Sequence, residues 1–438
     1  MQKQPHKIVI VGGGAGGLEL ATRLGKKWGK SKQVTITLVD ASLTHLWKPL
    51  WHEVAAGTLL SHEDELNYIA QAYQHQFNFE FGRLDGLNRQ AKQIFLAPII
   101  DEYNNEIIPR RTLQYDTLII AIGSVSNDFG TPGVREYCTF LDDRMQAEQF
   151  QQQLLKKILY SQNQLHMQGF TQLTIAIVGG GATGVELAAE LHYAIRQAAR
   201  YSRTKITPEY QIKITIIEAA DRLLSTLPAK ISQATQQQLE KMGIEVYTSQ
   251  RVLEVNSKGL RTNTGLFITA DLKVWAAGIK APDVLQNLDG LPVNRLNQLL
   301  VRQTLQTTID GDIFAFGDCA SCPQPNPTMP SVPPRAQAAN QQAKLLVRTI
   351  KRRLKNEPPL LYYYRDYGSL ISLSRQNTIG NLMGALRGSL FIEGKIARLV
   401  YLALYKKHQI VLYGFWHVFL LTLAHLLERR VKPQLKLH

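Results

Sequence analysis

The sequence predicts an α/β fold in which two similar units precede a basic C-terminal region. Lys7–Leu24 (KIVIVGGGAGGLELATRL) and Leu173–Leu191 (LTIAIVGGGATGVELAAEL) each join a Val/Ile-rich run, a glycine cluster and a helix-like stretch. A buried parallel strand that leads into a helix has this pattern. The last 95 residues hold 17 Lys and Arg against 4 Asp and Glu, while the preceding residues hold 33 and 31. The positive charge therefore belongs to the C-terminal region.

Further buried strands are expected at 115–123, 213–218, 272–278 and 312–318, where apolar runs end in glycine or an acid. The proline-rich stretch Cys322–Pro334 predicts an irregular loop, followed by a helix from Arg335 to about Lys355. The 438 residues are enough for two to three domains. We expect these to be 1–138 and 286–358 as two parts of a first domain, 139–285 as a second, and 359–438 as the C-terminal region.

The first glycine cluster has the spacing of a dinucleotide-binding turn. Gly12, Gly14 and Gly17 fit G-x-G-x-x-G, in which the glycines allow a tight turn, close phosphate approach and close helix–strand packing. The phosphates then lie at a helix N-terminus, whose free N–H groups favour negative charge. Asp40 ends the next strand and can accept hydrogen bonds from a ribose diol. A glycine-rich turn of no function is the alternative, which the order strand, glycines, helix, strand and acid disfavours.

The second cluster repeats this pattern with Gly179, Gly181 and Gly184. Its candidate acid is Glu218, 34 residues after Gly184, so a longer helix or an insertion around Tyr193–Tyr210 is expected. A carboxylate there would repel a 2′-phosphate, which favours NADH over NADPH; a solvated strand end is the alternative. The two clusters together predict two Rossmann-like dinucleotide-binding domains.

A chain with two such cofactors usually binds FAD at the first unit and a nicotinamide dinucleotide at the second. Glu186 follows Gly184 by two residues and is expected in the first turn of the second helix. It is therefore a candidate for contact with the nicotinamide and for a catalytic role. A helix carboxylate that complements the dipole is the competing interpretation.

The order of these motifs resembles the two-dinucleotide flavoprotein reductases. Within that superfamily the chain is most similar to the bacterial type II NADH:quinone oxidoreductases, the single-subunit, non-pumping respiratory NADH dehydrogenases. Three segments carry the similarity: THLWKPLWHEVAAG (Thr44–Gly57), VWAAGIKAP (Val274–Pro282) and PPRAQAANQ (Pro333–Gln341). The resemblance covers essentially the whole chain. It implies non-covalently bound FAD, NADH as the electron donor and a membrane quinone as the acceptor.

The resemblance also assigns residues to the sites. It implies that Asp318, in the terminal Gly-Asp pair, contacts the FAD ribityl chain. The quinone-pocket signature Ala-Gln-x-Ala-x-Gln matches Ala336, Gln337, Ala339 and Gln341, and two glutamines four apart share one helix face. The alternative for the two glutamines is a polar surface helix. Lys48 is expected near the flavin by the same resemblance, and the alternative for it is a solvated loop lysine. By resemblance we place Ala15, Lys48, Ala121, Gly123 and Ala336 at the FAD site, Gly278 at the NADH site, and Gln337 and Gln341 among the catalytic residues.

Only three cysteines are present, Cys138, Cys319 and Cys322, which is too few for a disulfide framework. The Cys-x-x-Cys pair follows Gly-Asp directly and could be a redox or metal motif. A single pair without further Cys or His is poor zinc coordination. We therefore expect packing beside the FAD, no metal site and no thiol chemistry.

The C-terminal region predicts attachment to a membrane surface. The apolar runs Leu390–Tyr405 and Ile410–Leu427 are separated by Lys406-Lys407 and closed by Glu428-Arg429-Arg430. The second run, 18 residues long, is near the lower limit for spanning a bilayer, and basic residues flank both ends. Amphipathic helices lying in the interface of an anionic membrane fit better. The alternatives are a helix pair docked on the protein's own core or a homodimer interface.

The combined prediction is a flavoenzyme that oxidises NADH and reduces a quinone, on the cytoplasmic face of the bacterial inner membrane. No export signal is expected at the N-terminus. The basic residues interleave with long apolar runs, which disfavours nucleic acid as a partner. A soluble FAD reductase that serves a protein or oxygen is a rival function.

Overall fold

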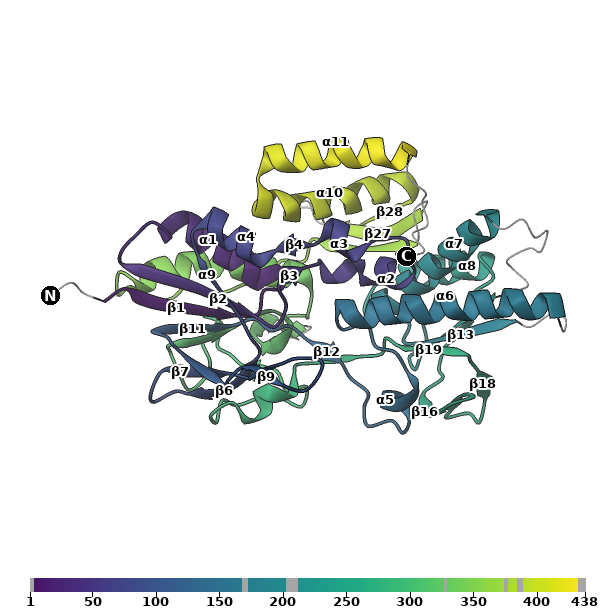
Figure 1. Ribbon diagram of the computed structural model, residues 1–438, viewed down its shortest axis with the longest axis horizontal. Coiled ribbons are helices and arrows are strands. Elements are labelled where there is room, and N and C mark those ends of the chain that lie inside the picture. The colour runs from purple at the N-terminus through teal and green to yellow at the C-terminus, as the bar shows by residue number, and fades with distance from the viewer. Residues whose placement is uncertain are drawn as a thin grey trace. The chain divides into compact units, whose positions relative to one another are not determined.

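The computed structural model describes residues 4–167, 172–201, 212–326, 329–373, 377–383 and 389–431. These fall into two compact units (Figure 1). Unit 1 takes its residues from the ranges 1–48, 65–125 and 279–365, and unit 2 from 49–64, 126–278 and 366–438. Each unit therefore contains one of the two glycine clusters.

Unit 1 is built on a five-stranded parallel sheet of order β22-β11-β1-β2-β5. Val11 at the end of β1 aligns with both Val39 of β2 and Ile120 of β11, so the carboxyl ends of three strands meet beside the first glycine cluster. The sheet strands are β1 His6–Val11, β2 Val34–Asp40, β5 Asn78–Phe81, β11 Thr117–Ile120 and β22 Ile313–Ala315.

Helices cover this sheet, and smaller elements complete unit 1. The helices are α1 Ala15–Trp28, α4 Tyr68–His75 and α9 Ala336–Arg353, and α1 packs against both others. A second sheet is antiparallel, with β6 Leu84–Asn88, β7 Gln93–Leu96 and β10 Arg111–Gln114. Short elements are β3 Thr44–His45, β4 Leu66–Asn67, β8 Ile99–Ile100, β9 Glu106–Ile108, β20 Ile279–Lys280, η3 Asp283–Asn287, β21 Leu299–Leu300, η4 Gly317–Cys319 and β23 Ala320–Ser321.

Unit 2 repeats the parallel architecture with the sheet order β15-β14-β13-β19. Its strands are β13 Leu173–Val178, β14 Ile212–Ile217, β15 Glu245–Tyr247 and β19 Leu272–Trp275. Its helices include α2 Trp51–Ala55, α3 Ser61–Asp64, α5 Val134–Tyr137, α6 Arg144–Met167, α7 Ala182–Tyr201 and α8 Ala229–Lys241. Two further elements, η1 Lys48–Leu50 and β12 Val125–Ser126, lie where the chain passes from one unit to the other.

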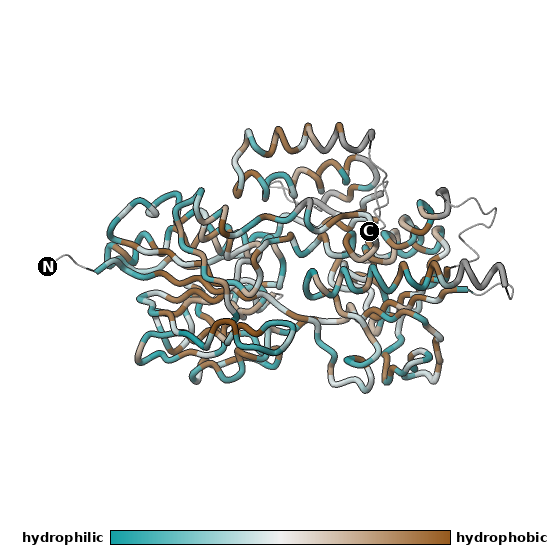
Figure 2. Tube along the Cα trace, viewed as in Figure 1, coloured by the Kyte–Doolittle hydropathy of each residue, from teal (hydrophilic) through white to brown (hydrophobic). Residues whose placement is uncertain are grey.

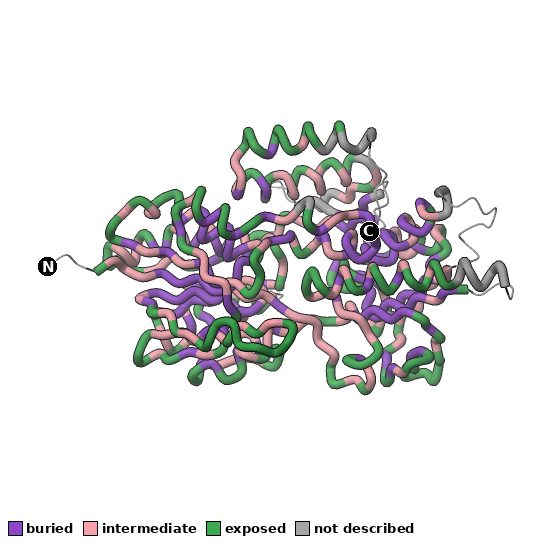
Figure 3. The backbone as a smooth tube through the Cα atoms, in the orientation of Figure 1, coloured by how far each residue is buried: buried purple, intermediate pink, exposed green. Residues whose placement is uncertain are grey.

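The cores of both units are the buried parallel strands, drawn purple in Figure 3. Ile8 and Ile10 of β1, like Ile177 of β13, have no exposed surface. This burial on both faces explains why these strands are continuous Val/Ile runs without polar alternation. The parallel strands that the sequence predicts at all four sites are confirmed.

The length of α7 accounts for part of the wide spacing in the second unit. This helix has 20 residues, whereas α1 in the first unit has 14. The helix extension predicted from the 34-residue gap is therefore present up to Tyr201, and residues 202–211 lie outside the described part of the chain.

The proline-rich stretch departs from the predicted irregular loop. It forms a two-stranded antiparallel ribbon of β24 Pro323–Asn326 and β25 Met329–Ser331 with an irregular register. Prolines are compatible with a ribbon of this kind because each strand has one edge that needs no N–H donor. The helix expected next is present as α9.

The C-terminal region differs from the prediction of two helical runs. It begins with an antiparallel sheet of β26 Gly368–Leu373, β27 Asn377–Met383 and β28 Ser389–Glu393, followed by α10 Gly394–Tyr413 and α11 Phe415–Val431. The helix break lies at Gly414, where φ is +87°, and Lys406-Lys407 lies inside α10. A lysine pair does not end a helix because its side chains extend into solvent, whereas a glycine with positive φ does.

A small antiparallel sheet in unit 2, β16 Val252–Asn256, β17 Gly259–Thr262 and β18 Phe267–Thr269, provides a test of the core. Leu260 is fully buried in a cluster with Trp275, while Leu253 on the neighbouring strand is 50 % exposed. Leu260→Ala is expected to lower the free energy of unfolding by about 2–5 kcal/mol because it leaves a cavity. Leu253→Ala should change it by less than about 0.5 kcal/mol. Urea unfolding followed by tryptophan fluorescence measures both, and equal effects would contradict the assigned core.

Candidate functional site

The first glycine cluster forms an open cradle at the N-terminus of α1. A Cβ at Gly12 would lie 2.4 Å from the Ala121 carbonyl oxygen, and one at Gly17 would lie 1.8 Å from the Gly12 oxygen. Gly14, by contrast, has no heavy atom within 4 Å of such a Cβ, and no side chain caps the helix there. Two glycines thus permit the turn, while the third leaves open space before free helix N–H groups. A pyrophosphate fits this arrangement.

Asp40 closes the cradle from the end of β2. Its Oδ2 accepts a hydrogen bond from the Gly13 amide at 2.5 Å, and its Oδ1 accepts one from Ser42 at 2.8 Å. Burial raises the pKa of Asp40, and these two backbone hydrogen bonds oppose that shift. Each carboxylate oxygen keeps a further lone pair. A ribose diol can therefore be bound without loss of the backbone contacts.

The second cluster has the same construction. A Cβ at Gly184 would lie 2.0 Å from the Gly179 oxygen, and the space at Gly181 is open. Glu218 accepts hydrogen bonds from the Gly180 and Ala220 amides, as Asp40 does from the corresponding positions. Both cradles thus hold a strand-end carboxylate on the amide of the middle glycine.

Arg222, the first arginine after Glu218 along the chain, is already engaged. Arg222 donates from its two terminal nitrogens to the carbonyl oxygens of Leu227 and Ser225, each at 2.8 Å. A guanidinium held in this way is not directed at Glu218. The preference for a 2′-hydroxyl over a 2′-phosphate therefore rests on the carboxylate of Glu218.

A chain of hydrogen bonds in unit 1 joins three residues near the carboxyl end of β11. Lys48 Nζ donates to the Ser124 carbonyl oxygen, and Ser124 Oγ donates to Asp318 Oδ2, each at 2.9 Å. Gly317, with φ of +73°, places Asp318 at this point, and its amide donates to Gln342 Oε1. The structure thus brings the predicted Lys48 and Asp318 together.

The remaining predicted residues of unit 1 lie around the same edge of the sheet. Ala15 and Ala336 begin α1 and α9, Ala121 donates its amide to Val11, and Gly123 has φ of +71°. Gly278 in unit 2 also has positive φ, and its oxygen accepts from the Asn127 amide.

The two signature glutamines lie on α9 with different surroundings. Gln341 pairs with the Arg365 backbone in both directions: its Nε2 donates to the carbonyl oxygen at 2.8 Å and its Oε1 accepts from the amide at 3.1 Å. The Gln341 amide nitrogen carries a second N–H, so Gln341 can donate elsewhere without losing this pairing. Gln337 is half-buried one turn earlier. Gln342, which the sequence offers only as part of a polar face, is buried and holds Gly317.

Glu186 lies in the second turn of α7, so its predicted place in the first turn is wrong. The helix begins at Ala182, and the carboxyl group extends into the protein, where Oε1 accepts from the Ser372 amide of β26 at 2.9 Å. Burial raises the pKa of Glu186 to about 8, with smaller contributions from Glu53 and Glu190. Glu186 is therefore mainly protonated at neutral pH, which disfavours the alternative of a charge that complements the helix dipole.

Buried groups of α2 and α10 surround Glu186. His52 Nδ1 lies 3.8 Å from Glu186 Oε2, but burial lowers the pKa of His52 to about 4, so it is neutral and forms no ion pair at neutral pH. Burial and the carboxyl groups of Glu186, Glu53 and Glu190 raise the pKa of Tyr401. Acid–base groups from three helices therefore converge within unit 2.

Several residues at these sites were not predicted from the sequence. Tyr68 donates its hydroxyl to the Gly13 oxygen at 2.7 Å, and Gln298 donates to the Asp318 oxygen. Neither belongs to a local motif. Glu190, in contrast, follows Glu186 by four residues on α7, and that spacing was a usable signal.

The cysteines are buried thiols in this structure. Cys319 lies 3.3 Å from the Phe316 oxygen, and burial raises the pKa values of Cys319 and Cys322 to about 12. Both are therefore protonated at neutral pH and weak nucleophiles, which supports the interpretation that they pack rather than react.

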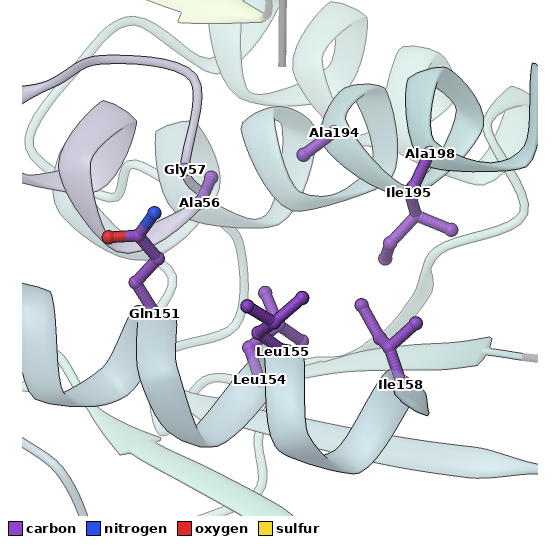
Figure 4. A pocket seen from close by; sticks show the side chains of 9 residues that line it. All are labelled: Ala56, Gly57, Gln151, Leu154, Leu155, Ile158, Ala194, Ile195 and Ala198. Carbon is purple, nitrogen blue, oxygen red and sulfur yellow. The ribbon is translucent and has the colours of Figure 1, made fainter. Parts of the chain in front are cut away.

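A small cavity in unit 2 lies between α6 and α7 (Figure 4). Leu154 and Ile158 of α6 face Ala194 and Ile195 of α7, with Ala56 at one end. Its lining is almost wholly apolar and includes no titratable side chain. The polar cradles described above are the better candidates for dinucleotide binding.

The first cradle yields a prediction with a matched control. Gly17→Ala is expected to abolish FAD retention because its Cβ would overlap the Gly12 carbonyl oxygen. Gly14→Ala meets no protein atom, so it should fold normally and weaken binding only through contact with the phosphates. The flavin absorbance per protein and the far-ultraviolet circular dichroism measure these outcomes. Full flavin content in Gly17→Ala would contradict the assignment.

Comparisons with known proteins agree with this geometry. A family model described as pyridine nucleotide-disulphide oxidoreductase matches residues 6–343. The chain is 45 % identical to a type II NADH:quinone oxidoreductase of Haemophilus influenzae, over 98 % of this chain and 99 % of that protein. It is 28 % identical to the type II NADH:quinone oxidoreductase NdhA of Mycobacterium tuberculosis, over 94 % and 84 %.

Solved structures share the fold. NDH2 from Plasmodium falciparum in complex with NADH matches with a TM-score of 0.77 and 21 % identity, over 95 % of this chain and 98 % of that chain. The sulfide:quinone oxidoreductase of Aquifex aeolicus matches with a TM-score of 0.71 and 17 % identity, over 93 % and 92 %. Together with the sequence relatives, the glycine cradles establish that this chain belongs to the type II NADH:quinone oxidoreductases of the pyridine nucleotide-disulphide oxidoreductase family.

Proposed function

We propose that this protein oxidises NADH with bound FAD and passes two electrons to a membrane quinone without pumping protons. The observation that carries this function is the pair of glycine cradles, each with its carboxylate on a middle-glycine amide. The 45 % identity to the Haemophilus influenzae enzyme along nearly the whole chain supports the same function.

FAD is assigned to the cradle of unit 1, where it supplies the acceptor for a hydride when bound. The helix N-terminus at Gly14 and the carboxylate of Asp40 hold the pyrophosphate and a ribose. Lys48, Ser124 and Asp318 form the polar group that orients the rest of the cofactor. Asp318 keeps an acceptor oxygen for a ribityl hydroxyl because Ser124 engages only its Oδ2.

NADH is assigned to the cradle of unit 2. Gly181 leaves room for the pyrophosphate, and Glu218 accepts from the ribose diol. The engaged Arg222 cannot neutralise a 2′-phosphate, so Glu218 selects against NADPH. The protein's part in this step is to bind and orient the donor.

Quinone binding is assigned to Gln337 and Gln341, which can donate to a carbonyl oxygen without bringing a charge into an apolar site. We assign to Glu186 the role of the acid that holds a proton for the reaction, because it stays protonated at neutral pH. An acid with a pKa near the working pH is effective in both donating and regaining a proton.

We assign the membrane contact to α10 and α11. Among the described side chains of α11, many large apolar ones are exposed, and Figure 2 shows the hydrophobic residues along this helix. The most exposed are Phe415, Trp416, Phe419, Leu420, Leu423 and Leu427, at 48 to 72 %. No helix within the described residues is long and apolar enough to cross a bilayer. An amphipathic helix with an exposed tryptophan is typical of the membrane interface.

The cytoplasmic face of the inner membrane is proposed for this attachment. Of the basic residues predicted to contact lipid headgroups, the structure describes the side chains of only two. Lys406 donates to Gln409 Oε1, and Lys407 is exposed on the surface of α10. The side chains of Arg429 and Arg430, and residue Lys432, lie outside the described part.

The catalytic function is tested by steady-state oxidation of NADH with a short-chain quinone. The purified, FAD-loaded protein should oxidise NADH at least tenfold faster with the quinone than with oxygen alone. It should prefer NADH to NADPH by at least about 1.4 kcal/mol, that is, tenfold. Glu218→Gln should reduce the preference for NADH over NADPH, because it removes the charge that repels a 2′-phosphate. Quinone-independent rates would contradict quinone reduction and favour a soluble reductase.

Membrane attachment is tested by co-sedimentation with anionic phospholipid vesicles. The double variant Trp416→Glu, Leu420→Glu should lose at least about tenfold in bound fraction, because two large apolar side chains no longer enter the acyl boundary. Leu159→Glu on α6, equally exposed at 57 %, is the matched control and should still bind. Unchanged sedimentation would refute the proposed membrane face. If the wild type is a dimer and the double variant a monomer, α11 belongs instead to an interface between copies.

A further inference from the structure

A hydroxyl group in unit 2 lies between two hydrogen-bond acceptors. Thr58 Oγ1 is 2.5 Å from Glu190 Oε1 of α7 and 3.2 Å from the main-chain oxygen of Glu53. Thr58 is 1 % exposed and Glu190 is 3 % exposed. A threonine hydroxyl carries a single proton and can donate to only one of these oxygens at a time.

Two protonation states therefore satisfy the same atoms. In the first state, Glu190 is ionised and Thr58 donates its proton to Glu190, so Thr58 makes no hydrogen bond to the Glu53 oxygen. In the second, Glu190 carries a proton and donates to Thr58, which then donates to the Glu53 oxygen. The main-chain oxygen cannot itself donate, so the direction of these two hydrogen bonds depends on whether Glu190 holds a proton.

The pair lies beside the protonated Glu186. The two glutamates are four residues apart on α7 and so share one helix face, and the charge of Glu190 favours the protonated form of Glu186. The other groups that face this cluster are Glu53 and the neutral His52 from α2, and Tyr401 and Tyr405 from α10. The Tyr401 hydroxyl is buried and has no hydrogen-bond partner among the described residues. The Ser372 amide completes the surroundings from β26.

We propose that Thr58 and Glu190 form a two-state proton-holding pair that controls the protonation of Glu186 during turnover. When Glu190 is ionised, Glu186 keeps its proton; when Glu190 takes up a proton, Glu186 can release its own. Both are positioning residues, because they act through Glu186. The inference rests on the role of Glu186 in the proposed function.

The proton balance of the reaction requires such a source. NADH gives up one proton and two electrons as a hydride, and a quinone takes up two electrons and two protons to become the quinol. One further proton per turnover must therefore come from solvent. The pair can hold that proton within unit 2 because the proton neutralises the Glu190 carboxylate. The Thr58 hydroxyl then turns its own proton to the Glu53 oxygen, so both hydrogen bonds are made.

The test compares pH profiles of kcat in Glu190→Gln and Thr58→Val with wild type, using a short-chain quinone and, separately, ferricyanide, which accepts electrons but no protons. In wild type we expect activity with quinone to fall at alkaline pH as Glu186 loses its proton. Glu190→Gln removes the neighbouring charge, so the pKa of Glu186 falls and this alkaline limb should move to lower pH. Thr58→Val removes the donor to ionised Glu190, favours its neutral form and should shift the limb in the same direction.

Three further variants separate this role from a structural one. Thr58→Ser keeps the hydroxyl and should restore the wild-type profile. Glu148→Gln removes the charge from a similar hydroxyl–carboxyl pair, with Ser61, in the same unit and should leave the profile unchanged. Ferricyanide reduction and flavin content should stay within about twofold of wild type in all of these, since the electron path does not need the pair.

An independent measurement is the infrared difference spectrum between acid and alkaline pH. Wild type should show bands from two protonated buried carboxyl groups, Glu186 and Glu190; Glu190→Gln should keep only that of Glu186, and Thr58→Ser should keep both. An unshifted alkaline limb in Glu190→Gln would overturn the proposed role of the pair. Equal losses of activity with quinone and with ferricyanide in this variant would overturn it as well. If the limb persists in Glu186→Gln, the role proposed for Glu186 fails; if it vanishes there but is unmoved in Glu190→Gln, only the pair fails.

Discussion

The hydrogen bond from a middle-glycine amide to a strand-end carboxylate is the interaction on which both proposed cofactor sites depend. It occurs twice, between Gly13 and Asp40 and between Gly180 and Glu218. In each case it fixes the carboxylate beside the helix N-terminus, so that one short loop presents amides to a pyrophosphate and an acid to a ribose. The glycine itself is required because a Cβ at Gly13 would meet the Tyr68 hydroxyl and one at Gly180 would meet Leu223.

The middle glycine of each cluster is held by different residues in the two units. In unit 1 the Tyr68 hydroxyl donates to the Gly13 oxygen, whereas in unit 2 the Leu224 amide donates to the Gly180 oxygen. The parallel strands and glycine turns are therefore shared, while the surrounding side chains are specific to each cofactor. The polar chain from Lys48 to Asp318 is an example in unit 1, and the buried acids around Glu186 are an example in unit 2.

The sequence predicted those features that depend on neighbouring residues along the chain. Strand periodicity, glycine spacing and the terminal acids were enough for both cradles, because each lies within one strand–turn–helix–strand unit. The sheet β26–β28 was missed: most of β28 was interpreted as the start of a helical run, no element was predicted at β26 or β27, and the pairing needs three separate segments. Tyr68 and Thr58 were missed for the same reason, because their partners lie 55 and 132 residues away. The place of Glu186 was misjudged by one turn because the helix start cannot be fixed from glycine spacing alone.

The central claim is that two separate cradles bind a flavin and a reduced nicotinamide that react with each other. The most direct measurement is anaerobic mixing of the FAD-loaded protein with NADH in increments, with the flavin absorbance recorded after each addition. The account predicts that the yellow colour bleaches in proportion to added NADH and is complete at one equivalent per chain. Protein that carries no flavin, or flavin that keeps its colour in excess NADH, would contradict it.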